Sequence, residues 1–227
     1  MVNEHAIGTI TDIREDGSVV IKATLPNLDH ALLRRYKDVE IILPDGRRIS
    51  ADQRRKVYAL IGEVAEYVDG IKNAETIEEQ KQFLKMDFLL ERLESQERRI
   101  FSLSDCDMTL AKEFISYIID FIVKNDIPTS ISLLEQCEDI RRYIYSCAMN
   151  RKCCICGREA DIHHITGSKI GMGNVREEVH HLGREVLPLC RTHHMECHQD
   201  EKTFMDKYHL EAIALDEALC RRLKLRK

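Results

Sequence analysis

The sequence predicts an α+β fold, in which a small N-terminal antiparallel sheet and a helical bundle precede a compact C-terminal part rich in cysteine and histidine. Three observations predict it. Two short apolar runs near the N-terminus flank a turn signal, long stretches with helical spacing follow, and that spacing gives way near Asn150 to sequence rich in Cys, His and Gly. We therefore expect two domains, residues 1–150 and residues 151–227.

The N-terminal sheet is predicted from turn residues between apolar runs. Residues 6–13 and 18–23 flank the dipeptide Asp16-Gly17, and a third run, residues 39–43, leads into Pro44-Asp45-Gly46. Gly and Asp in these positions favour tight turns between antiparallel strands.

Four helices are expected after this sheet. Ser50 is a suitable N-cap for the first, which ends at Asp69-Gly70, and Thr76 with Glu79 has the spacing of a capping box that opens the second. The third stops before Pro128, because proline cannot continue a helix. The expected ranges are about 50–69, 76–93, 109–124 and 132–149.

The composition excludes several classes of protein. With 227 residues, 44% of them hydrophobic, the chain can bury a sizeable core. It has no apolar stretch of roughly 18 to 20 residues, its polar start does not resemble a secretion signal, and it has no P-loop motif. We expect a cytoplasmic protein with no membrane partner, and not an ATP-driven helicase or recombinase.

The charge is unevenly distributed. Residues 1–150 hold 20 Lys and Arg against 27 Asp and Glu, whereas residues 151–227 hold 14 against 12. A nucleic-acid-binding protein needs only a locally positive face, so the net charge of -5 neither supports nor excludes DNA as a partner.

The cysteines predict a metal site. Five of the nine cysteines and seven of the ten histidines lie between Cys153 and His198. This clustering indicates metal binding in a reducing compartment rather than disulfides. The pairs Cys153-x2-Cys156 and Cys190-x2-His193 have the spacing of tetrahedral structural zinc, although Cys197 could take the place of His193.

Further histidines predict a second, catalytic ion. His194 and His198 are four residues apart and would share one face of a helix, and His163 could supply a third ligand from a strand. Mg, Mn, Ni or Zn could serve there, with imidazole favouring the transition metals. An unperturbed imidazole has a pKa near 6.5, so a neutral His164 could act as general base towards water. In an extended strand its side chain would point away from that of His163, so we expect some distortion of the strand if His164 flanks the ion.

These residues together resemble the HNH, or ββα-metal, endonuclease family. The resemblance covers residues 150–200 and rests on C-x2-C, D-I-H-H-I and L-P-L-C-R-T-H-H-M-E-C-H. It implies a zinc-stabilised β-hairpin packed on a helix, one catalytic divalent ion, and hydrolysis of DNA phosphodiester bonds. By position His164 matches the base, and the matching ligands of the catalytic ion are His163, His194 and His198.

The central Asn of that family is displaced here. The stretch 180–186 reads H-H-L-G-R-E-V, and Asn174 in a glycine-rich loop is the only Asn between the metal motifs. We therefore expect Asn174 to orient the loop that carries the base, with His181 and Arg184 as the alternatives.

Residues 40–145 are similar to phage recombination proteins of the NinB (Orf) type, on the stretch 49–65 and on F101-S102-L103-S104. Such proteins bind single-stranded DNA and assist strand annealing. The combined resemblance is to phage-encoded HNH nucleases, which act in the host cytoplasm. The basic residues expected to contact DNA are Arg54, Arg55, Lys169, Arg176 and Arg184.

The sequence thus predicts a metal-dependent DNA endonuclease of phage recombination or replication. DNA, whether single-stranded, branched or duplex, a second copy of the chain and a single-strand-binding protein are the partners to expect. The alternative is a non-catalytic single-stranded-DNA-binding recombination mediator, whose HNH-like part is a zinc-stabilised docking module. A zinc-organised protein-interaction module is a third hypothesis.

Overall fold

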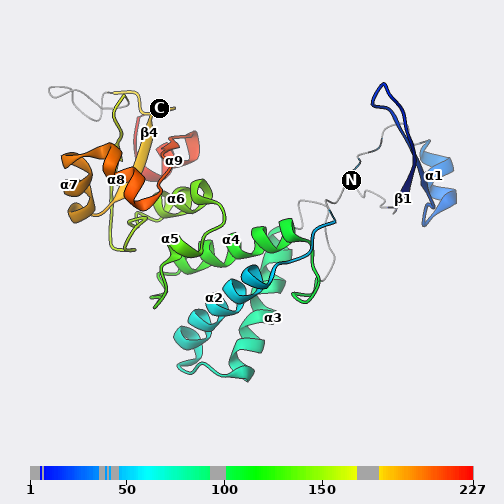
Figure 1. The fold of residues 1–227 in the computed structure, drawn as a ribbon, viewed down its shortest axis with the longest axis horizontal. Helices are drawn as coiled ribbons and strands as arrows, with labels where there is room; N and C mark the ends of the chain where they lie inside the picture. Colours follow the sequence, from blue (N-terminus) through cyan, green and yellow to red (C-terminus); the bar gives the residue numbers. More distant parts are fainter. Residues whose placement is uncertain are drawn as a thin grey trace. The chain divides into compact units, whose positions relative to one another are not determined.

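The computed structural model describes residues 6, 8–35, 39, 41, 46–92, 101–167 and 179–226. It is a mixture of helices and small antiparallel sheets, which agrees with the predicted α+β class. The chain forms two compact units, Met1–Asp45 with Glu94–Gln96, and Gly46–Leu93 with Glu97–Lys227 (Figure 1). Among the described residues, no helix is both long and apolar enough to cross a membrane.

The first unit contains a β-hairpin and a short helix. Strand β1 (Gly8–Ile13) pairs antiparallel with β2 (Val19–Ala23), and the predicted turn has Gly17 at φ 83° with the Ser18 amide bonded to Asp16. Helix α1 (Leu28–Arg34) was not predicted. The third expected strand, residues 39–43, lies mostly outside the described residues.

Three long helices open the second unit: α2 (Ala51–Asp69), α3 (Ala74–Glu91) and α4 (Met108–Lys124). The predicted Ser50 cap is confirmed, and α2 ends at Gly70, whose φ of 70° suits glycine. The predicted start of α3 was wrong by a few residues. Asn73 caps this helix, and Thr76 is its third residue, which completes a capping box with Asn73.

The single helix expected over residues 132–149 is two helices, α5 (Leu133–Gln136) and α6 (Ile140–Met149). The chain is extended at Cys137, and Asp139 caps α6. Glu138 in the break accepts hydrogen bonds from Gln53 and Lys56 of α2. Contacts to another helix therefore interrupt a segment whose local spacing is helical.

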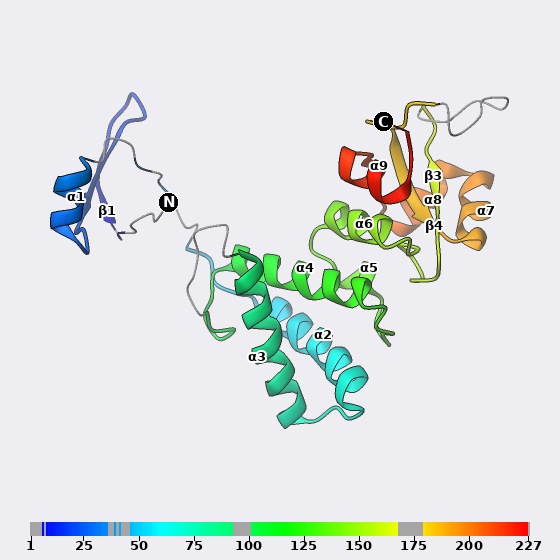
Figure 2. The same cartoon turned by 180° about the vertical axis from the view of Figure 1, so that it is seen from behind.

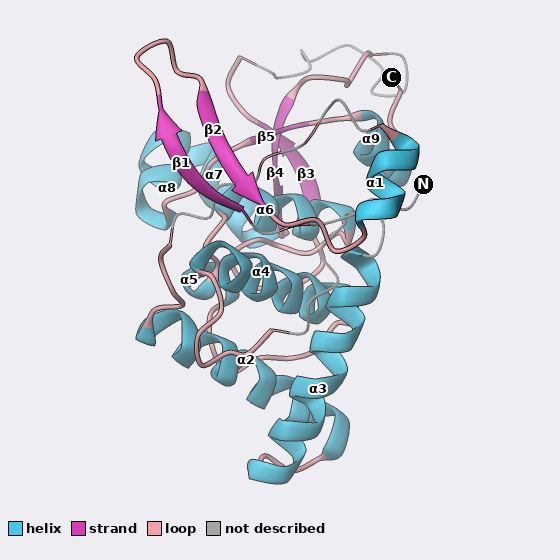
Figure 3. Cartoon of the chain, turned by 90° about the vertical axis from the view of Figure 1, so that its right-hand side faces the viewer, coloured by secondary structure: helices cyan, strands magenta, loops and turns pink. Residues whose placement is uncertain are grey.

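The C-terminal part is a three-stranded antiparallel sheet with helices around it. Its order is β3 (Asp161–His164), β4 (Glu185–Leu189) and β5 (Ile213–Ala214), seen side by side in Figure 3. Pro188 is tolerated in the central strand because β5 pairs only with Glu185 and Val186. Helices α7 (Arg191–Gln199), α8 (Glu201–Tyr208) and α9 (Glu217–Leu223) complete this part (Figure 2).

The helical bundle and the C-terminal part share one hydrophobic core. It runs from Ile49 to Leu223, and α6 packs against both β4 and α9. The boundary expected near Asn150 thus lies inside the second compact unit. That residues 1–150 and 151–227 have separate functions remains a prediction.

Candidate functional site

Local backbone geometry forms the first half of a candidate metal site. A tight turn after α6 carries Cys153 and Cys156, with the Gly157 amide bonded to the Cys153 carbonyl at 2.9 Å and Gly157 at φ 68°. The second half follows β4, where Cys190 is the N-cap of α7 and His193 lies in its first turn. Pairing of β3 with β4 brings the two halves together.

Four residues form what we call the cysteine cluster: Cys153, Cys156, Cys190 and His193. Their ligand atoms lie within 4.8 Å of one another. The Sγ atoms of Cys156 and Cys190 are 3.7 Å apart, and His193 Nδ1 lies 3.4 Å and 3.3 Å from the Sγ atoms of Cys153 and Cys190. Tetrahedral zinc coordination separates two sulfurs by about 3.8 Å and a sulfur from a nitrogen by about 3.5 Å. The donor set and its spacing therefore fit zinc.

The thiols of this cluster have different surroundings. Burial raises the pKa of Cys153 to about 11. Burial also opposes ionisation of Cys156, but hydrogen bonds, first among them that from Arg158, outweigh it and lower the pKa of this exposed thiol. Arg158 Nε lies 3.4 Å from Cys156 Sγ. Three thiols and an imidazole in so small a space suit a dication, which displaces the thiol protons on binding.

His163, His194 and His198, hereafter the histidine cluster, form the second group. His194 and His198 lie one turn apart on α7, and the His163 ring on β3 is 4.7 Å and 4.9 Å from theirs, centroid to centroid. Ligand atoms of the three fall within 4.8 Å. His163 is buried, His194 is half-buried and His198 is exposed, so the cluster is open to solvent on one side. Burial lowers the pKa of His163, which favours the neutral ring that binds metals.

Two residues without a predicted role at this second group also contact His163. Cys197 Sγ and Glu201 Oε2 each lie 3.4 Å from His163 Nε2, and the Glu201 carboxylate accepts the Thr166 amide at 2.8 Å and 3.0 Å. The sequence left open whether Cys197 replaces His193 as the fourth zinc ligand. In the structure His193 lies with the three cysteines, and Cys197 contacts His163 instead. Helical spacing could not place Glu201, because Asp200, extended at φ -153°, separates α7 from α8.

His164 faces away from the histidine cluster. Pairing of β3 with β4 continues without a register shift through His163 and His164, so their side chains point to opposite faces of the strand. His164 Nε2 lies 3.2 Å from Nδ1 of His181, which is fully buried in the segment before β4.

The other predicted site residues are dispersed. Asn174, Lys169 and Arg176 lie outside the described residues. Arg184 Nε donates to the His180 carbonyl at 2.6 Å, within its own segment.

The two arginines predicted to contact DNA in the helical bundle already have protein contacts. Arg54 Nε donates to the Leu103 carbonyl and its Nη2 to the Ser104 carbonyl, at 3.0 Å and 2.7 Å. The exposed Arg55 pairs with Asp52. Arg54 thus fastens α2 to a loop, and its contact with DNA stays a prediction, as does that of Arg55.

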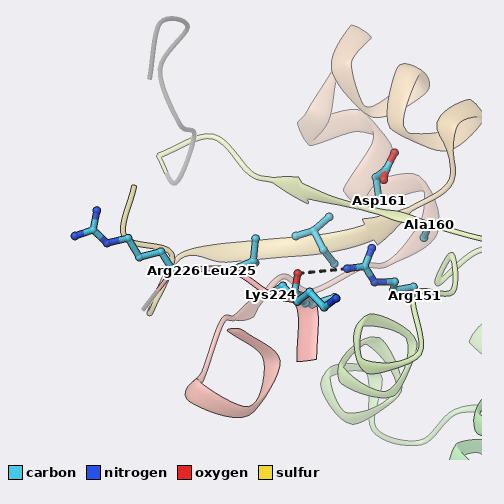
Figure 4. Close-up of a pocket in the computed structure, with 8 residues that line it drawn as sticks. Arg151, Ala160, Asp161, Lys224, Leu225 and Arg226 are labelled. Atoms are coloured by element: carbon cyan, nitrogen blue, oxygen red, sulfur yellow. Dashed lines mark hydrogen bonds between the residues drawn. The ribbon is translucent and has the colours of Figure 1, made fainter. Parts of the chain in front are cut away.

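A cavity of about 280 Å³ lies beside β3 and the C-terminal segment (Figure 4). The residues that line it include three basic ones, Arg151, Lys224 and Arg226, and one acidic one, Asp161. Arg151 donates to the Leu223 carbonyl at 3.3 Å, which ties the end of α6 to α9.

Comparisons with known proteins identify relatives of this chain. Residues 31–226 match the family described as "Putative HNHc nuclease". A 57-residue segment is 47% identical to the uncharacterized protein YdfU of Escherichia coli strain K12; it makes up 25% of this chain and only 15% of that protein. No solved structure gives a significant match.

Proposed function

Because the chain belongs to the HNHc nuclease family, we propose that it is a metal-dependent endonuclease that hydrolyses DNA phosphodiester bonds. The observation that carries the proposal is the histidine cluster, three imidazoles supplied by β3 and α7. The cysteine cluster, which suits structural zinc, is a separate set of residues, so the histidine cluster can bind a catalytic ion.

In this proposal the cysteine cluster holds structural zinc. Four protein ligands close the coordination sphere, as structural sites require. The zinc would tie the turn at Cys153 to the first turn of α7, and so fix the helix that carries His194 and His198. Binding offsets the entropy lost when a segment rich in loops becomes ordered.

The histidine cluster would hold the catalytic divalent ion. Three protein ligands and an exposed side match an open, catalytic site. When bound, the ion supplies Lewis-acid stabilisation of the charge that develops on the phosphate and the leaving oxygen. Glu201 is a hydrogen-bond partner that would orient His163, because its carboxylate is itself held by the Thr166 amide.

His164 is the proposed general base. It follows His163 directly, at a rise of about 3.3 Å along β3, but its side chain points to the opposite face of the strand. To act on a water at the ion, His164 therefore requires a local distortion of β3 when metal and DNA bind. A neutral imidazole takes a proton from the attacking water and can pass it on to solvent. Arg55, Arg184, Lys169 and Arg176 would contact phosphates, with Arg54 as a weaker candidate.

We place this activity in phage DNA recombination or replication, in the host cytoplasm, on the resemblance of residues 40–145 to NinB-type proteins. Cutting a duplex requires one nick in each strand. A homodimer would supply two active sites for these nicks, so we propose that the chain acts as a dimer. Single-stranded and branched DNA are substrates to test beside duplex DNA, and single-strand-binding protein is a partner to test.

One observation keeps a second function in consideration. The residues before β4 lack the central Asn of the HNH pattern, so the C-terminal part could be a zinc-stabilised docking module of a recombination mediator. That protein would bind single-stranded DNA without cutting it.

The test is conversion of supercoiled plasmid and of branched DNA by the full chain with Mg, Mn, Ni or no metal. We expect metal-dependent nicking that His164→Ala abolishes at unchanged zinc content. His180→Ala, which removes an exposed imidazole nearby, is the matched control and should cleave as the wild type does. If no metal supports cleavage while single-stranded DNA still binds, the mediator function replaces the nuclease.

A further inference from the structure

A pair of histidines links the proposed base to a buried partner. His164 Nε2 and His181 Nδ1 are 3.2 Å apart, and the rings are tilted by 49° at a centroid distance of 5.2 Å. The His181 side chain is 0% exposed. A buried imidazole is stable where its nitrogens have hydrogen-bond partners. Loss of the contact between the two rings would therefore destabilise the fold.

Backbone contacts from distant parts of the chain fix the position of His181. Its amide donates to the Arg226 carbonyl at 3.0 Å, and its carbonyl accepts from Arg184 at 3.0 Å. Gly183, at φ 79°, donates to the Leu215 carbonyl at 2.7 Å, and Leu215 donates back to Arg184 at 2.9 Å. The segment before β4 is therefore held by the residues on both sides of α9.

From this geometry we infer that His181 is a positioning residue that holds His164 in its Nε2–H tautomer. The inference rests on the proposed function of His164. One hydrogen lies between two neutral rings. When His164 Nε2–H donates to His181 Nδ1, the basic nitrogen of His164 is Nδ1, and this atom takes the proton from water. In the opposite tautomer Nδ1 already carries a hydrogen and cannot accept one.

The same chemistry separates His181 from the two other residues considered for this role. A guanidinium has only donors, so Arg184 cannot accept the Nε2 hydrogen, and its Nε is bonded to the His180 carbonyl. Asn174 has an amide oxygen that could accept it, so it enters the experiment as a competitor.

The direct test is the tautomer of His164 in the full, zinc-loaded chain. Long-range 1H–15N correlation spectra at about pH 8, above the usual imidazole pKa, distinguish Nε2–H from Nδ1–H rings. We expect pure Nε2–H at His164 in the wild type. The amide oxygen of His181→Asn can still accept and should preserve this tautomer, whereas His181→Leu should give a mixture.

Cleavage kinetics give the second readout. His181→Leu should lower kcat about 10- to 100-fold with KM unchanged, and His181→Asn should recover most of that loss. His180→Ala, the exposed neighbour, should change neither the tautomer nor kcat.

Several results would overturn the inference. An Nδ1–H ring at His164 in the wild type does so even if His181→Leu fails to fold. So does a His164 tautomer that changes in Asn174→Ala but not in His181→Leu, or full activity in His181→Leu when His164→Ala is inactive. Absence of cleavage with every metal would instead count against the proposed nuclease function. The tautomer of His164 in the wild type would still show whether His181 holds it in the Nε2–H form.

Discussion

The cysteine cluster and the histidine cluster use the same helix for different purposes. Cys190 and His193 at the start of α7 face the buried Cys153, whereas His194 and His198 face His163 and reach solvent. The first set has four ligands and mostly buried sulfurs, and the second has three ligands and an open side. A change of one residue along a helix, from His193 to His194, thus separates a site suited to stability from one suited to reaction.

The largest effect should come from breaking the cysteine cluster. Cys153→Ser removes a fully buried ligand, and structural zinc in small sites contributes about 10 kcal/mol or more, which is comparable with the whole stability of a domain. We expect loss of one zinc per chain, unfolding of the C-terminal part and complete loss of cleavage. Metal analysis and thermal melting measure this.

Cys137→Ser is the matched control, because this thiol lies in the break between α5 and α6 and donates to the Leu134 carbonyl. It should retain zinc. A Cys153→Ser protein with full zinc content and an unchanged melting temperature would refute the structural role.

A smaller effect on stability, but a large one on activity, is expected from the histidine cluster. His194→Ala should keep the zinc of the cysteine cluster and the fold, while cleavage falls on the order of 100- to 1000-fold through loss of charge stabilisation. Met195→Ala, an exposed neighbour on α7, should behave as the wild type. Loss of the cysteine-bound zinc in His194→Ala would show that the two clusters do not act separately.

The smallest effect should come from Glu201. In Glu201→Gln the amide oxygen can still accept the Thr166 amide, but the negative charge beside His163 is lost. We expect the divalent-ion concentration for half-maximal cleavage to rise about 10- to 100-fold, with a near-normal rate at saturation. Glu211→Gln, an exposed acid paired with Arg141, is the control. An equal shift in both variants would mean that surface charge alone is responsible.

The features that the sequence determined by itself, helix caps and ligand pairs, lie within single helices or short turns. Ser50 and Gly70 bound α2 because caps act locally, and the spacings of Cys153 with Cys156 and of His194 with His198 place ligand pairs on one turn or one helix face. His163 was proposed as their companion from its place in a predicted strand and again from the family resemblance, and the structure brings it to them.

Only the tertiary structure decided the contacts between separate segments. Glu138 breaks a helical run because it bonds to α2, Glu201 reaches His163 across a helix break, and His181 meets His164 because the C-terminal segment holds its backbone. The partners in these contacts are 17 to 85 residues apart in sequence. Local periodicity carries no information about such distances, since they depend on how strands pair and helices pack.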